Sequence, residues 1–240
     1  MAPMRRALVS LALLAAACRS PASEATFPPV VGGPLPITIS STTGTHSTFR
    51  GEISRIDTEL ANELQGPNWR PGCPVALEDL RLLVVSYWGF DGDIHEGPLI
   101  LHEDVVEDVR WVFERLFRAR FPIKHIALAR RWHEPTEADY RTTSSITASF
   151  NCRPITEGTT LSQHSYGWAI DINPLQNPYI RADGSVLRLA AKPYRDRSLE
   201  LPGMIHPGDV VVRSFARIGW EWGGDWTSLK DYMHFSLTGR

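Results

Sequence analysis

The segment W-A-I-D-I at 168–172 sets an ionisable carboxylate between apolar residues, and burying a carboxylate without a partner is costly. In a β-strand, successive side chains point to opposite faces of the sheet. A strand here would turn its three large apolar side chains to the core, and Ala169 with Asp171 to the other face. We therefore interpret Asp171 as one ligand of a metal site.

Two histidines are placed to complete such a site. His164 precedes Asp171 by seven residues, and His234 opens the segment M-H-F-S-L, in which Phe235 and Leu237 are expected to point into the core. A catalytic zinc takes three protein ligands and keeps a fourth position for water, whose pKa it lowers towards about 7. The sequence therefore predicts one zinc ion, bound by His164, Asp171 and His234.

A second aspartate is the candidate catalytic base. Asp231 lies three residues before His234, on the turn that leads into the predicted strand. A carboxylate that does not bind the metal can take a proton from the attacking water and pass it to the leaving amine. Glu221, between two tryptophans in another predicted strand, is the competing candidate for this role.

These residues fall in two motifs, S-x-H-x-x-G-x-A-x-D at 162–171 and D-x-x-H at 231–234. In this order the motifs resemble the zinc D-alanyl-D-alanine peptidases of the M15 type, which include VanY-like carboxypeptidases and the L-alanyl-D-glutamate endopeptidases of phage lysins. The similarity extends through Y-W-G-F-D-G, S-F-N-C-R-P and W-G-G-D-W, so most of 68–235 resembles one cell-wall peptidase branch.

The resemblance implies roles for two further residues. In this family an arginine upstream of the first zinc histidine helps to hold a substrate carbonyl or carboxylate, and Arg153 stands at the matching position. A guanidinium suits an oxygen that gains charge in the transition state; a structural or surface arginine is the alternative. Ser162, by the same resemblance, forms hydrogen bonds around the site and is not a nucleophile.

Strand-like segments outnumber helical ones and do not alternate with them regularly, which favours an α+β fold. The resemblance implies a single domain of the hedgehog/DD-peptidase type, with a small antiparallel sheet flanked by helices. Strands are predicted at 80–88 and 98–102, joined by a long loop, and at 124–130, 144–152 and 233–237.

Helices are predicted from apolar residues that recur on one face. The segment 103–120 has acidic residues at its start and basic ones at its end, which favours a helix. A second helix is predicted at 207–219, with Pro207 in its first turn and Gly219 at its end. Near-helical spacing also links Ile53 with three apolar residues up to Leu64.

The chain begins with a short basic head and an apolar stretch that ends at Cys18, which is too short for a membrane span of about 20 residues. We interpret 1–18 as an export signal. The A-A-A-C ending resembles a lipobox, so lipidation of Cys18 and ordinary cleavage after A-x-A both stay open. The segment 19–49 is predicted as a flexible linker, and 50–240 as the M15-like metallopeptidase domain.

Export leaves Cys73 and Cys152 as an even pair in a compartment that permits disulfides. Either a disulfide between them or two buried thiols fits the sequence.

The expected activity is hydrolysis of a peptidoglycan stem-peptide bond that involves a D-amino acid, in the cell envelope. A terminal D-alanine and the L-Ala to D-Glu bond are both open as targets. A formal charge of −2 and the lack of a Lys/Arg run exclude a nucleic-acid partner, and we expect a monomer attached to the membrane only through Cys18. The alternatives are a non-catalytic, zinc-containing cell-wall binding lipoprotein of the same fold and an envelope lipoprotein with an incidental resemblance.

Rival interpretations remain for a few side chains. His206 is the one competing ligand, although it is predicted to cap a helix. A Ser162/His164/Asp171 triad is disfavoured by its spacing. The tryptophans Trp220, Trp222 and Trp226 either line a groove for glycan or peptide or belong to the core, and we assign two of the three to the core.

Overall fold

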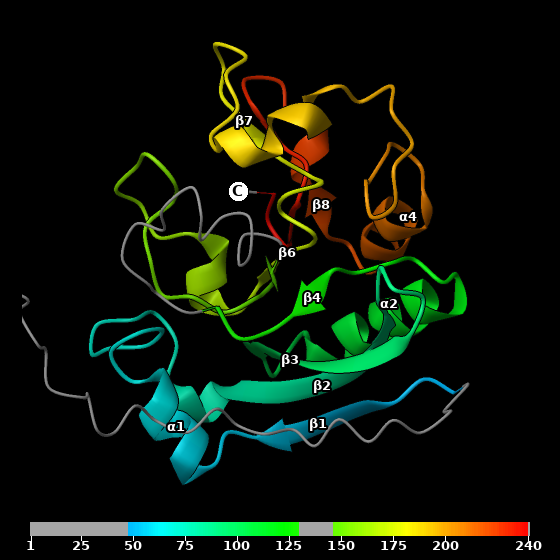
Figure 1. Ribbon diagram of the computed structural model, residues 1–240. Helices are drawn as coiled ribbons and strands as arrows, with labels where there is room; N and C mark the ends of the chain where they lie inside the picture. The colour runs from blue at the N-terminus through cyan, green and yellow to red at the C-terminus, as the bar shows by residue number, and fades with distance from the viewer. Residues whose placement is uncertain (1–47, 130–145, 240) are drawn as a thin grey trace, which may run out of the picture. The chain divides into compact units, whose positions relative to one another are not determined.

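A three-stranded antiparallel sheet forms the first part of the fold (Figure 1). It consists of β1 (Gly51–Arg55), β2 (Leu80–Trp88) and β3 (Ile94–His102), with β2 in the middle. The computed structural model describes residues 48–129 and 146–239. The predicted signal segment, Cys18 and nearly all of the predicted linker lie outside these ranges.

The β2–β3 pair confirms the predicted hairpin and corrects its length. The two strands pair from Leu80 with His102 to Trp88 with Ile94. The loop is therefore shorter than predicted, because the amide of Gly89 bonds to the Asp93 carbonyl and Gly92 adopts a positive φ of 82°. The polar residues after this turn still pair with β2.

The helical spacing predicted from Ile53 to Leu64 is wrong for its first residues. Ile53 lies in β1, and the helix α1 runs only over Thr58–Leu64. Asp57 fixes this boundary, because its side chain caps the helix by accepting a hydrogen bond from the Leu60 amide at 2.8 Å. A short 3₁₀ helix, η1 (Leu77–Asp79), then leads into β2.

Helix α2 (Val106–Arg118) confirms the prediction for 103–120 and packs against β2. Acidic residues occupy its first turn and basic residues its last, as the helix dipole favours. One face of the helix and of its N-cap residue is buried throughout, and it consists of apolar side chains: Val105, Val109, Val112, Phe113, Leu116 and Phe117.

Helix α4 (Val210–Arg217) begins later than predicted and packs against α2. Asp209 caps it by accepting hydrogen bonds from the amides of Val211 and Val212 at 2.9 and 3.0 Å. Pro207 therefore precedes the helix. His206 is not the cap, since its own amide donates to the Asp209 carboxylate.

A second sheet, in the order β6–β10–β8, contains the last residue of each sequence motif, Asp171 and His234. Its strands are β6 (Ala169–Asp171), β8 (Glu221–Trp222) and β10 (His234–Ser236). Phe235 is fully buried, as predicted, but Leu237 is 37% exposed. The prediction for Leu237 fails because β10 ends at Ser236 and the strand alternation ends with it.

Two-stranded pairs complete the framework. The strands β4 (His125–Ile126) and β5 (Ile146–Thr147) are parallel, and both are shorter than predicted. The strands β7 (Tyr179–Ile180) and β9 (Lys230–Asp231) are antiparallel. Three more 3₁₀ helices lie between these elements: η2 (Gln163–Tyr166), η3 (Leu189–Arg195) and η4 (Gly223–Asp225).

One apolar core joins the two sheets through α2 and α4. It includes Leu83 and Leu99 of the first sheet and Ile170 and Phe235 of the second, and all four are at most 1% exposed. Helices and small antiparallel sheets in this mixture confirm the α+β class. The assignment to a hedgehog-type fold stays a prediction. Within 48–129 and 146–239, no helix is both long and apolar enough to cross a bilayer.

Cys73 and Cys152 form a disulfide, with their Cα atoms 6.0 Å apart. This resolves the alternative of two free thiols. The bond closes a loop with a sequence separation of 79 and joins an apolar cluster that includes Leu60 and Phe150. Its second half-cystine is directly followed by Arg153.

We predict that replacing both half-cystines with serine lowers the free energy of unfolding by about 2–4 kcal/mol, because the unfolded chain regains the freedom of a long loop. Urea denaturation followed by tryptophan fluorescence measures this. Dithiothreitol should bring the native midpoint down to that of the variant and leave the variant unchanged. Equal midpoints for the oxidised native protein and the variant would contradict the prediction.

Candidate metal centre

The pairing of β6 with β10 brings the two sequence motifs together. Asp171 lies directly opposite His234 in the antiparallel register, so both side chains leave the same face of the sheet. The Nδ1 atom of His234 is 3.0 Å from Oδ1 of Asp171. The Asp171 side chain is 21% exposed and that of His234 is 7% exposed.

The turn η2 positions His164. Ser162 caps this turn, and its hydroxyl accepts a hydrogen bond from the His164 amide at 3.4 Å. Gly167 ends the turn with a φ of +72°, and a Cβ atom there would lie 2.6 Å from the amide nitrogen of His102. The glycine of the motif is thus required both by its backbone conformation and by the close approach of β3.

The ring orientation of His164 is fixed by a backbone acceptor. Its Nδ1 lies 2.6 Å from the carbonyl oxygen of Ser149 and must donate to it. The other nitrogen, Nε2, therefore carries a lone pair in the neutral ring. This Nε2 is buried, lies 3.2 Å from Oδ1 of Asp171 and forms no hydrogen bond.

A cation at this point would satisfy all three side chains. One ligand atom each from His164, Asp171 and His234 lies within 4.8 Å of the others. Zinc–ligand bonds of about 2.0–2.1 Å in a tetrahedron separate neighbouring ligand atoms by about 3.3 Å, close to the 3.0 and 3.2 Å found here. A lone pair facing a carboxylate oxygen without a proton between them is the arrangement that a metal ion stabilises, so these residues fit zinc.

The electrostatics at Asp171 are those of a ligand carboxylate. Burial by itself would raise the pKa of Asp171, but the interactions of its carboxylate with the imidazoles of His164 and His234 outweigh burial and hold that pKa well below its usual range. Asp171 therefore stays ionised and able to bind a cation.

Asp231 has the opposite electrostatic character. Burial, with the nearby negative charge of Asp171, raises the pKa of Asp231 to about 7, although His234 and Arg153 favour its ionised form. Its Oδ1 atom is buried and has no hydrogen-bond partner. A carboxyl group in this state can hold or release a proton near neutral pH.

Backbone packing holds Asp231 in place on two sides. In β9 it pairs with Tyr179 of β7, so part of the long irregular segment after β6 runs along its strand. On η4, a Cβ atom at Gly223 would lie 2.5 Å from the Asp231 carbonyl oxygen and 3.0 Å from its Cβ. Only glycine fits between η4 and β9 without displacing Asp231.

Arg153 is held near the centre by the residues that flank His164. Its amide donates to the Ser165 hydroxyl at 3.0 Å, and its carbonyl accepts from the Ser162 amide at 3.0 Å. Its guanidinium donates to the Pro154 carbonyl and is close enough to favour the ionised form of Asp231. The substrate-binding role of Arg153 stays a prediction.

The rival candidates lie elsewhere or play another part. Neither His206 nor Glu221 contributes to the group of three ligand atoms, and Glu221 is exposed in β8. Of the tryptophans, Trp220 and Trp222 are buried in the core, whereas Trp226 is partly exposed.

Sequence reasoning missed one part of the surroundings, the carbonyl of Ser149 that orients His164. A backbone carbonyl has no sequence signal, because any residue type supplies it. Trp226, which the sequence named as a candidate groove residue, lies with the centre of its indole 5.6 Å from that of the His234 ring.

Comparison with known proteins gives one family match. A family model of the M15 peptidases, described as D-alanyl-D-alanine carboxypeptidase, matches residues 156–237, about a third of the chain. Searches of curated proteins and of solved structures returned no match. The matched range contains His164, Asp171, Asp231 and His234, while Arg153 lies just before it. Residues 156–237 are therefore similar to the M15 peptidase family.

Proposed function

We propose that this protein is a zinc-dependent peptidase that hydrolyses a bond of the peptidoglycan stem peptide next to a D-amino acid. The observation that carries the proposal is the convergence of three ligand atoms within 4.8 Å, with the unbonded carboxylate oxygen of Asp231 buried beside them. The family match over 156–237 supports a peptide substrate. The choice between a terminal D-alanine and the L-Ala to D-Glu bond is left to the experiment.

His164, Asp171 and His234 would hold the ion. A zinc ion with three protein ligands supplies a Lewis acid and lowers the pKa of water at its open position towards about 7. The carbonyl of Ser149 keeps the imidazole of His164 oriented. Such a partner raises the affinity of a metal site.

Proton transfer is assigned to Asp231. Its carboxylate takes a proton from the attacking water and then donates it to the leaving amine. A pKa near 7 suits a group that must do both at neutral pH. Arg153 would pair with the substrate oxygen that gains negative charge, since its guanidinium can donate two parallel hydrogen bonds.

We further propose that the protein is exported and works in the cell envelope, with Cys18 as the point of lipid attachment. The basic and apolar pattern of 1–18 supports this proposal. The Cys73–Cys152 bond is compatible with it, because disulfides persist outside the cytosol.

The first prediction concerns the metal. His164→Ala should weaken zinc binding by more than about 100-fold, because even the loss of an outer hydrogen-bond partner costs about 10- to 100-fold. Metal content after desalting, measured by mass spectrometry, reports this.

Two further variants make the metal result interpretable. Asp171→Asn nearly preserves side-chain shape and should also lose zinc, whereas His95→Gln, in the first sheet, should bind one zinc ion per chain as the native protein does. Circular dichroism verifies that each variant is folded. A folded Asp171→Asn chain with normal zinc content would show that the ligand set is wrong.

The second prediction concerns the base. Asp231→Asn should retain zinc and lose turnover by about 10²- to 10⁴-fold, because an amide cannot take up the proton. Asp93→Asn, in the turn between β2 and β3, is the matched control and should turn over normally. Unchanged turnover in Asp231→Asn would remove Asp231 from the reaction.

The third prediction identifies the bond. Incubation of defined muropeptides with the zinc-loaded protein should release either D-alanine or a fragment that begins at D-glutamate, and a chelator should abolish the release. Mass spectrometry of the products distinguishes the two cuts. Intact muropeptides after prolonged incubation with zinc-loaded, folded protein would refute the proposed function and favour a binding protein.

A further inference from the structure

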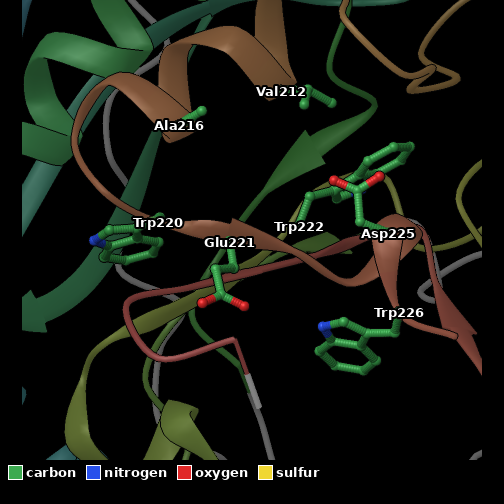
Figure 2. Close-up of a pocket in the computed structure, with 7 residues that line it drawn as sticks. All are labelled: Val212, Ala216, Trp220, Glu221, Trp222, Asp225 and Trp226. Atoms are coloured by element: carbon green, nitrogen blue, oxygen red, sulfur yellow. The ribbon is translucent and has the colours of Figure 1, made fainter. Parts of the chain in front are cut away.

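A cavity of about 310 Å³ lies between α4, β8 and η4 (Figure 2). In Figure 2 the Glu221 carboxylate lies between the indole rings of Trp220 and Trp226. Trp222 and Asp225 line the cavity from the other side of β8, and α4 supplies small apolar side chains. None of these residues is assigned to the hydrolytic reaction.

The cavity adjoins the candidate metal centre. Trp226 lines it, and the same indole lies 5.6 Å from the ring of His234. The turn η4, which carries Asp225, also packs against Asp231 through Gly223. A molecule that occupies the cavity would therefore lie next to the reacting bond.

The chemistry of the lining selects for positive charge. Glu221 and Asp225 contribute two carboxylates, and the lining contains no basic side chain. Within 48–129 and 146–239, neither carboxylate forms an ion pair or a side-chain hydrogen bond. Indole faces attract ammonium and guanidinium groups.

Building on the proposed function, we infer that this cavity binds the side-chain ammonium of a diamino acid in the stem peptide. The indole of Trp226 would contact the methylene chain, and Glu221 would receive the ammonium. Trp226 both lines the cavity and contacts His234, so a single substrate molecule could place its amine in the cavity and its scissile bond at the metal centre. The cavity is thus a specificity subsite for a cationic residue.

Two synthetic stem peptides test the inference. They differ only in that one carries lysine at the diamino position and the other carries Nε-acetyl-lysine, which has no charge. The native protein should show a KM about 10-fold lower for the lysine peptide, as expected for a charge-assisted hydrogen bond to a carboxylate. Equal KM values for the two peptides would overturn the inference.

Variants then test whether the carboxylates of the cavity cause the lower KM for the lysine peptide. Glu221→Gln combined with Asp225→Asn should raise the KM for the lysine peptide about 10-fold and leave the KM for the acetylated peptide unchanged. Glu78→Gln, an exposed carboxylate on η1, is the control for net charge and should keep the native preference. A preference that survives the double substitution would place the ammonium elsewhere and overturn the inference.

A binding measurement separates this subsite from the proposed activity. Calorimetric titration of the Asp231→Asn chain with each peptide reports affinity without turnover. If the lysine peptide binds more tightly but the native protein cuts neither peptide, the subsite stands and the proposed hydrolysis fails. If the native protein cuts both peptides equally well and the Asp231→Asn chain binds both equally, the hydrolysis stands and the subsite fails.

Discussion

The interaction on which the site depends is the approach of two imidazole nitrogens to one carboxylate oxygen of Asp171. A buried carboxylate is costly unless it is paired, and the distances of 3.0 and 3.2 Å to His234 and His164 supply the pairing. The ring of His164 cannot relax away, because Ser149 holds its other nitrogen. The fold thus holds several ligand atoms with lone pairs close together, and a divalent cation bound between them would stabilise this arrangement.

The long segment after β6 has little regular structure, yet it is held firmly where it approaches this centre. Arg197 donates hydrogen bonds to the carbonyl of Ile205 at 2.7 Å and to the side chain of Asn177 at 3.2 Å. Its guanidinium also lies 4.4 Å from the centre of the Tyr232 ring, directly after Asp231. A partly buried guanidinium that donates to several acceptors therefore fixes this segment in place of regular secondary structure, and burial lowers the pKa of Arg197.

The parts of this structure that could be predicted from the sequence are those that local patterns specify. Strand β2 matches its predicted bounds because its run of apolar and aromatic residues is long, and α2 has a continuous apolar face. The convergence of His164, Asp171 and His234 could be anticipated from the spacing and order of two motifs. Ser149, β7 and the true start of α4 could not, because backbone carbonyls, two-residue strands and a capping Asp209 depend on tertiary neighbours.

The contact between Gly223 and Asp231 limits which sequence changes the η4 turn can tolerate during evolution. The hydrogen atoms of Gly223 face the carbonyl of the residue assigned to carry the proton, while two residues further along the same turn Asp225 borders the neighbouring cavity. Reshaping that cavity by moving the turn would shift the proton carrier as well. Substrate selectivity can therefore change through substitution of the side chains that line the cavity. Insertions or deletions in the turn itself would displace Asp231 and reduce catalytic activity.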